Sequence, residues 1–225
     1  MMNRWKAFAL HLLLSLVLIS GIAATALLTW YPWGLYRISG LDRLLVVMLC
    51  IDIVAGPLLT LMIYKPGKPH LRLDLSVIAL VQAGFLAYGL HTLWQSRPVF
   101  LVASDVRFDL VLASDLDESQ VAAAPRPEWR RLSWSGPRLV GVLPPEDSAE
   151  RQRLLAILLE TGRDLHQLPE QYLPFEQVRD RILANAKNQP GGDREPALPV
   201  MSRFGEARML IDPATAMPLR VLPPA

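Results

Sequence analysis

The sequence predicts a membrane α-helical domain with three transmembrane helices, followed by a small α+β soluble domain. Hydrophobic residues make up 52% of the 225 residues, and the longest apolar segments all lie within residues 1–97. Charge is segregated in the same way: residues 1–97 contain 8 Lys/Arg and 3 Asp/Glu, whereas residues 98–225 contain 15 Lys/Arg and 18 Asp/Glu. Because one chain holds two such different compositions, we expect a membrane domain over residues 1–97 and a soluble, periplasmic domain over residues 98–225.

Three apolar segments have the length of a membrane-spanning helix. They cover residues 8–30, 44–64 and 75–94. About 20 residues are enough for a helix to cross ~30 Å of hydrocarbon. Aromatic residues cluster at the ends of these segments, as is typical of membrane–water interfaces. They are Trp5, Trp30, Tyr31, Trp33, Tyr36, Tyr64 and Trp94.

The basic residues beside the spans predict their orientation. Five lie on one side of the membrane, namely Arg4, Lys6, Lys65, Lys68 and Arg72. Three lie on the other side, namely Arg37, Arg43 and Arg97. Because the more basic flanks stay in the cytoplasm, we expect a multi-pass protein of the bacterial inner membrane with a cytoplasmic N-terminus. Residues 24–26 leave a second interpretation open, in which span 1 is a cleaved signal peptide.

Asp52 is the most informative polar residue of the membrane domain. It lies in the middle of span 2, where a charged carboxylate costs roughly 2.5–3.5 kcal/mol. One interpretation is a structural role, with Asp52 hydrogen-bonded inside the bundle to Tyr88, Ser20 or Thr25. The other is a docking point for a helix of another membrane protein.

Gly56 and Pro57 follow Asp52 within the same span. Pro57 has no backbone N–H, so it leaves the Ile53 carbonyl without its helical donor. We therefore expect a kink here, with the Thr60 hydroxyl partly satisfying the freed backbone groups.

Small residues recur on span 3. Ala79, Ala83 and Ala87 are spaced four residues apart, and Gly84 lies beside them. Small side chains allow two helix backbones to approach closely in a membrane. The row predicts either packing of span 3 inside the bundle, which we favour slightly, or a groove for a partner helix.

The soluble domain shows a mixed pattern of strands and helices. The alternation of apolar and polar residues predicts strands at 99–103, 106–112 and 139–143. A helix is expected from Asp147 or Ser148 to near Gly162, because these residue types favour helix starts and ends. The remaining expectations are an irregular segment at 113–137, a second helix at 174–187, a chain break at 190–192 and a hairpin of 209–211 with 219–222.

No motif of a catalytic or metal-binding site occurs in the sequence. It has no phosphate-binding loop, no Gly-x-Ser-x-Gly and no His-Glu-x-x-His. His166 is the only histidine after residue 98, and Asp52 is the only acidic residue inside the hydrocarbon, whereas an aspartyl intramembrane protease needs two. No basic block indicates nucleic-acid binding. We expect no enzyme, no cofactor, no metal and no small-molecule substrate, with the lipid bilayer as the surrounding medium.

Several short motifs, in this order and spacing, resemble the TfpX/TfpZ family of type IV pilin accessory proteins. They are Arg4-Trp5-Lys6-Ala7-Phe8, Trp30-Tyr31-Pro32, Asp52 with Gly56-Pro57-Leu58-Leu59-Thr60-Leu61, Lys65-Pro66-Gly67-Lys68, Asp74-Leu75, Tyr88-Gly89 and Arg97-Pro98-Val99. The resemblance covers residues 4–112 well and the rest only in general shape. It implies a non-enzymatic accessory protein or chaperone for pilin stability and pilus assembly, with a type IV pilin as its partner. The alternative is a scaffold or sensor subunit of another envelope complex.

Overall fold

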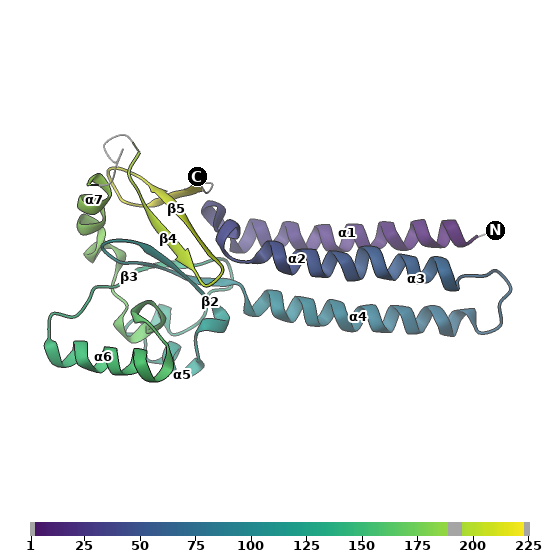
Figure 1. Ribbon diagram of the computed structural model, residues 1–225, viewed down its shortest axis with the longest axis horizontal. Helices are drawn as coiled ribbons and strands as arrows, with labels where there is room; N and C mark the ends of the chain where they lie inside the picture. The colour runs from purple at the N-terminus through teal and green to yellow at the C-terminus, as the bar shows by residue number, and fades with distance from the viewer. Residues whose placement is uncertain (1–2, 189–194, 223–225) are drawn as a thin grey trace. The chain divides into compact units, whose positions relative to one another are not determined.

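The computed structural model describes residues 3–188 and 195–222 and divides into two compact units (Figure 1). One unit consists of Met1–Leu28 and Leu41–Trp94, and the other of Thr29–Gly40 and Gln95–Ala225. We call them the membrane unit and the outer unit. The chain break expected at 190–192 lies outside the described residues.

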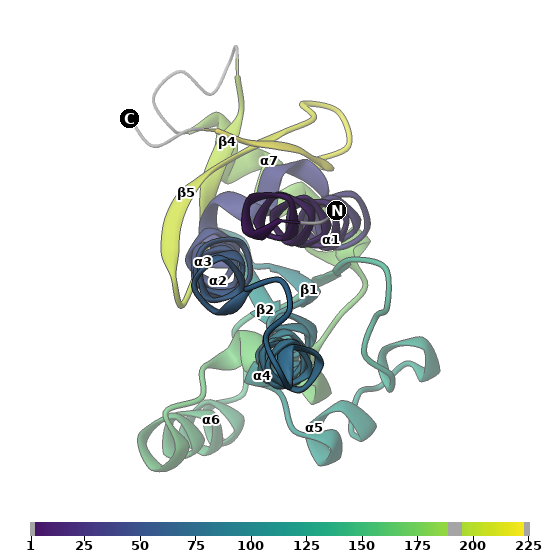
Figure 2. The same cartoon turned by 90° about the vertical axis from the view of Figure 1, so that its right-hand side faces the viewer.

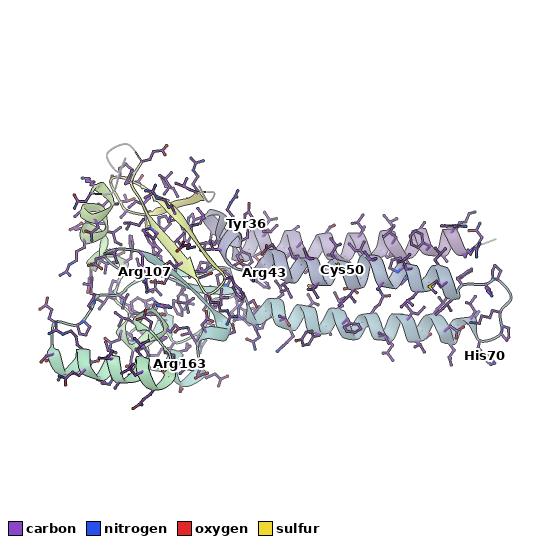
Figure 3. All side chains as sticks on the ribbon, viewed as in Figure 1. Tyr36, Arg43, Cys50, His70, Arg107 and Arg163 are labelled. Carbon is purple, nitrogen blue, oxygen red and sulfur yellow. The ribbon has the colours of Figure 1, made fainter. Side chains whose placement is uncertain are left out.

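The membrane unit contains three long apolar helical segments, as predicted. The first is α1 (Arg4–Trp30) and the third is α4 (Leu71–Gln95). The second is made of α2 (Leu41–Leu49), the π-helix η2 (Cys50–Ala55) and α3 (Gly56–Ile63). Each segment is long and apolar enough to cross a membrane, so the chain is a membrane protein. Seen end-on, α2 and α3 lie beside both α1 and α4 (Figure 2), and the side chains around the helices are mostly carbon (Figure 3).

The irregular part of the second span begins before Pro57. The N–H of Gly56 donates to the carbonyl of Ile51, five residues earlier, which is the π-helical pattern. Pro57 then begins α3. In an i→i−5 register the N–H that Pro57 lacks would have met the Asp52 carbonyl. The sequence argument, which assumed a plain α-helix, expected the Ile53 carbonyl alone to lose its donor.

The outer unit is built on one mixed sheet of six strands. In chain order they are β1 (Pro98–Ala103), β2 (Phe108–Leu112), β3 (Arg138–Gly141), β4 (Ala197–Ser202), β5 (Gly205–Ile211) and β6 (Pro218–Leu222). Their spatial order is β3-β1-β2-β4-β5-β6. The β1–β2, β4–β5 and β5–β6 pairs are antiparallel, whereas β1–β3 and β2–β4 are parallel. Together with its helices, this sheet confirms the predicted α+β class.

Among its described residues, the outer unit also contains three α-helices and several short 3-10 helices. The α-helices are α5 (Glu118–Ala122), α6 (Ser148–Thr161) and α7 (Arg179–Lys187). The 3-10 helices are η1 (Pro32–Ile38), η3 (Ala113–Asp115), η4 (Pro127–Trp129), η5 (Leu165–Gln167), η6 (Pro169–Gln171) and η7 (Phe175–Gln177). Helix α6 begins and ends as expected, because the Asp147 side chain accepts from two backbone N–H groups and Gly162 adopts the left-handed conformation. The helix expected at 174–187 is divided into η7 and α7.

The core of the outer unit lies against the central strands. Every residue of β1 and β2 is buried, including Asp109, the polar residue of β2. The reason is its position as the third of six strands, where both faces of a sheet are covered. Phe100 of β1 packs edge-on against Tyr172, with ring centroids 5.1 Å apart.

The segment between the first two spans belongs to the outer unit. Trp30 Nε1 donates to the Trp134 carbonyl at 2.8 Å, and the Tyr31 hydroxyl donates to the Ser96 carbonyl at 3.4 Å. The Ser202 hydroxyl donates to the Ile38 carbonyl. Trp30, Tyr31 and Ile38 are therefore each hydrogen-bonded to a different part of the outer unit.

Candidate functional site

A hydrogen bond between α1 and α3 lies inside the membrane unit. His11 Nδ1 and the Thr60 hydroxyl are 2.6 Å apart, and Thr60 is buried. The sequence argument assigned Thr60 to the backbone groups freed by Pro57. The structure instead gives its hydroxyl a side-chain partner on another helix, and this contact ties the first span to the second.

Asp52 is buried next to this contact, and only 6% of its surface is exposed. Its backbone carbonyl accepts a long hydrogen bond of 3.5 Å from Gln82 Nε2 on α4. Gly56 makes room for Gln82, because a Cβ on Gly56 would lie 1.8 Å from Gln82 Nε2. The sequence argument missed Gln82, although a lone glutamine within an apolar segment was a visible signal.

The partners expected for the Asp52 carboxyl are placed elsewhere. Tyr88 is 72% exposed, so it lies on the outer surface of the membrane unit. Thr25 donates to the Gly21 carbonyl of its own helix at 2.8 Å. The structure thus brings Asp52, Gly56 and Thr60 together, with His11 and Gln82 as their neighbours.

The small-residue row of α4 faces outward. Ala79, Ala83 and Ala87 are all exposed in the membrane unit. Buried positions of the helix lie on another face and are Ile78, Gly89 and Leu93. Ala79, although exposed, lines a hollow that it shares with residues of α1 and α3, so packing of the row inside the bundle, which the sequence argument favoured slightly, stays a prediction. Beyond the row, an open hollow of about 460 Å³ is lined by Val81, Gly84, Phe85 and Tyr88.

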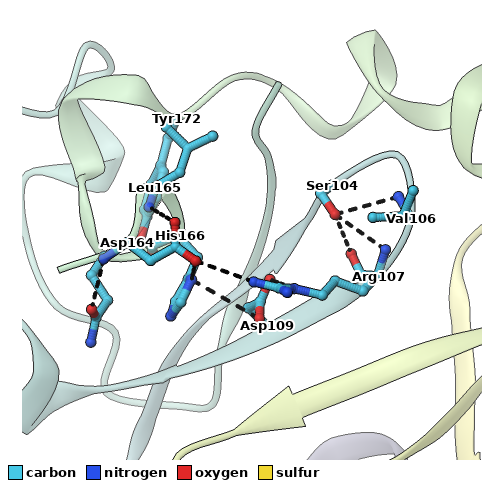
Figure 4. A network of polar contacts seen from close by, with 9 residues as sticks. Ser104, Val106, Arg107, Asp109, Asp164, Leu165, His166 and Tyr172 are labelled. Atoms are coloured by element: carbon cyan, nitrogen blue, oxygen red, sulfur yellow. Dashed lines mark hydrogen bonds and ion pairs between the residues drawn. The ribbon is translucent and has the colours of Figure 1, made fainter. Parts of the chain in front are cut away.

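In the outer unit, charged side chains form a network beside β2 (Figure 4). Arg107 Nε lies 2.9 Å from Asp109 Oδ2, and its Nη2 lies 3.3 Å from Asp164 Oδ2. His166 Nδ1 lies 3.6 Å from Asp164 Oδ2 and 4.0 Å from Asp109 Oδ1. The hydrogen bond that Arg107 donates to Asp109, together with the charges of the Asp109 and Asp164 carboxylates, raises the pKa of Arg107.

This network joins separate elements of the outer unit. Asp164 caps η5, so the ion pair with Arg107 ties that helix to the start of β2. Ser104 is held within the β1–β2 turn by bonds to the backbone of Arg107. Burial raises the pKa of the Tyr172 hydroxyl, which donates to the His166 carbonyl at 2.6 Å. Among residues 3–188 and 195–222, no group of three or more His, Cys, Asp or Glu could hold a metal ion.

Helix α6 presents apolar side chains to solvent. None of its residues is buried, and Leu155, Leu158 and Leu159 are exposed, Leu159 to 78%. Its ends are nevertheless well capped, so the helix is a defined element of the fold. An apolar helical surface of this kind is typical of a binding face for another protein.

Comparison with known proteins gives related sequences in Dichelobacter nodosus. The chain is 28% identical over 186 residues to the fimbrial assembly protein of serogroup I, covering 81% of this chain and 71% of that protein. The serogroup E1 protein matches with the same identity and coverage. The fimbrial assembly protein of serogroups C1 and C2 is 32% identical over 99 residues, covering 43% of this chain and 76% of that protein.

No protein-family model and no solved structure matches the chain. The aligned 186 residues are more than either unit contains, so the similarity extends across both the membrane unit and the outer unit. The names of these relatives describe assembly rather than catalysis. On the identity and coverage of the serogroup C1 and C2 protein, the chain belongs to the family of these fimbrial assembly proteins.

Proposed function

We propose that the protein is a non-enzymatic accessory protein, or chaperone, for a type IV pilin, and that it supports pilin stability and pilus assembly. The observation that carries this proposal is the similarity to fimbrial assembly proteins across both units. The proposed location is the bacterial inner membrane, with the N-terminus in the cytoplasm and the outer unit in the periplasm. The distribution of basic residues beside the spans supports this orientation.

Within the membrane, the proposed contact is the exposed row of small residues on α4. A pilin in the inner membrane has an apolar N-terminal helix, and lipid gives two such helices no hydrophobic reason to associate. Close backbone approach over small side chains does favour association. Ala79, Ala83 and Ala87 offer such a surface, because their side chains are small and exposed.

Outside the membrane, the proposed contact for the pilin head is the exposed face of α6. Leu155, Leu158 and Leu159 together form an apolar surface. Burying such side chains releases roughly 25 cal/mol per Å² of apolar area. Two contacts on one pilin, one in lipid and one in water, would reinforce each other through the covalent link between them.

Site-specific photo-crosslinking in a piliated host tests this function. A photoreactive residue replaces Ala83 on α4 or Leu159 on α6, and Val17 on α1 serves as a control that is 64% exposed. We expect a pilin adduct from the first two positions and none from Val17. Adducts with a different envelope protein at both positions, together with normal pilin levels in a deletion strain, would refute the proposal and favour a scaffold or sensor role.

A further inference from the structure

A hollow with a basic lining lies between η1 and β6 of the outer unit. Its volume is about 460 Å³, and its lining consists of Trp33, Gly34, Tyr36, Arg37, Arg220, Val221 and Leu222. The loop is shaped by two successive left-handed residues, Trp33 with φ 58° and Gly34 with φ 80°. A non-glycine residue rarely adopts this conformation, so the surrounding contacts must hold the loop in place.

A third arginine, Arg208, does not line the hollow but lies on the same face of the sheet as Arg220. In the β5–β6 pair, Leu210 lies opposite Arg220 and Arg208 lies opposite Leu222. Paired side chains share one face of a sheet, and diagonal neighbours such as Arg208 and Arg220 are roughly 7–8 Å apart. We call Arg37, Arg208 and Arg220 the arginine patch.

The members of the arginine patch differ from other arginines of the outer unit in their ion pairing. Among the described residues, none of its three members forms an ion pair, and no acidic side chain lines the hollow. By contrast, Arg107 and Arg203 of the same unit each contact a carboxylate within 3.3 Å. Within residues 3–188 and 195–222, the arginine patch therefore has no ion-pair partner.

Covalent connection brings the hollow to the membrane surface. Helix η1 follows the end of α1 at Trp30 and precedes the start of α2 at Leu41, and both of these are membrane spans. A segment between two spans lies at the membrane–water interface. Trp33 and Tyr36 are residue types that prefer this interface (Figure 3 labels Tyr36). The Arg37 guanidinium lies over the Tyr36 ring, 5.4 Å from its centroid.

We propose that the arginine patch and the hollow bind the phosphate headgroup of an anionic phospholipid. Guanidinium groups form bidentate hydrogen bonds with phosphate oxygens. Basic pockets at the membrane surface attract anionic headgroups, and each arginine strengthens the interaction about fivefold. The lipid is favoured over free phosphate because the aromatic residues of the hollow offer apolar surface to the glycerol and acyl region, which inorganic phosphate lacks.

Native mass spectrometry of the full-length protein tests this site. The protein is purified in detergent and offered equal amounts of phosphatidylglycerol and phosphatidylcholine. We expect retained phosphatidylglycerol to exceed phosphatidylcholine. The double variant Arg208→Gln/Arg220→Gln leaves the η1 loop unchanged and should lose about 25-fold of this preference, at about fivefold per arginine. The matched control is Arg151→Gln/Arg181→Gln, which removes two exposed arginines from α6 and α7 and should behave as the wild type.

Two results would overturn the proposal. One is an unchanged preference for phosphatidylglycerol in the Arg208→Gln/Arg220→Gln variant, with a melting temperature equal to that of the wild type. The other is displacement of the lipid by excess inorganic phosphate, which would mean that the site binds free phosphate. Resistance of the bound lipid to phosphate supports the lipid headgroup as the ligand.

Discussion

At the scale of single residues, the contact between His11 and Thr60 links two spans that are far apart in the sequence. Thr60→Val keeps the shape of the side chain and removes the hydroxyl, which leaves His11 Nδ1 unpaired in an apolar environment. A buried polar group without a partner costs about 1–3 kcal/mol. We expect a lower melting temperature in detergent, measured by thermal unfolding of the purified protein. Thr60→Ser retains the hydroxyl and should stay close to the wild type, so equal melting temperatures for the two variants would contradict the assignment.

Gly56 and Gly84 form a matched pair of glycines in membrane helices. A Cβ on Gly56 would displace the Gln82 amide from the Asp52 carbonyl, whereas a Cβ on Gly84 would meet nothing within 4 Å. We expect Gly56→Ala to destabilise the protein by about 1 kcal/mol, the usual contribution of one hydrogen bond. Gly84→Ala should be neutral. Protease resistance of both variants in membranes measures the difference, and equal resistance would show that Gln82 has no such contact.

The sequence identified some members of the intramembrane cluster and not their partners. Asp52 and Thr60 stood out because polar groups are costly in hydrocarbon. The sequence could not show that His11 and Gln82 lie beside Asp52 and Thr60, because the π-helix before Pro57 adds a residue to one turn of the span. An extra residue rotates all later side chains by about 100° around the helix axis. If the ordinary helical period is used for the whole span, residues before Cys50–Ala55 and residues after it cannot both be assigned to the correct helix face.

At the scale of elements, the spans were predictable and β4 was not. Membrane helices are recognised from local composition, because lipid requires each span to be apolar over its full length. Strand β4 carries Pro199, which argues against a strand inside a sheet. It pairs with β2 in parallel over only two residue pairs, Phe108 with Val200 and Asp109 with Met201. Because β2 and β4 are far apart in the sequence and pair over so few residues, the residues around β4 carry no pattern that predicts this pairing.

The exposed face of α4 yields a prediction that separates folding from function. Ala83→Leu adds a branched side chain to a surface position, so the stability should change by less than ~0.5 kcal/mol. The row would no longer allow close approach of another helix, and pilin abundance and surface pili should fall. Immunoblots of this protein and of pilin from one membrane preparation measure both effects. Val17→Leu on α1 is the control. A fall in the level of the Ala83→Leu protein itself would indicate that Ala83 packs inside the bundle.

At the scale of the whole molecule, the contacts of α1 argue that span 1 is retained. Residues 24–26 resemble a signal-peptide cleavage site, and cleavage there would remove His11 and leave Thr60 without its partner. We expect the intact mass of the membrane-extracted protein to include span 1. A mass corresponding to a chain that begins near residue 27 would show that the α1 contacts are lost on maturation.

The orientation of the whole chain is the remaining prediction, and it follows from charge and the number of spans. Five basic residues flank one side of the spans and three flank the other, so the five-residue side is expected in the cytoplasm. Three spans then place the outer unit in the periplasm. Alkaline phosphatase fused to the C-terminus should be active, because this enzyme folds only outside the cytoplasm, and a fluorescent protein fused there should stay dark. The opposite pattern would place the apolar face of α6 in the cytoplasm, where it could not meet a pilin head. Fusions within residues 65–70, between α3 and α4, provide the internal control and should give the reverse result in the same strain.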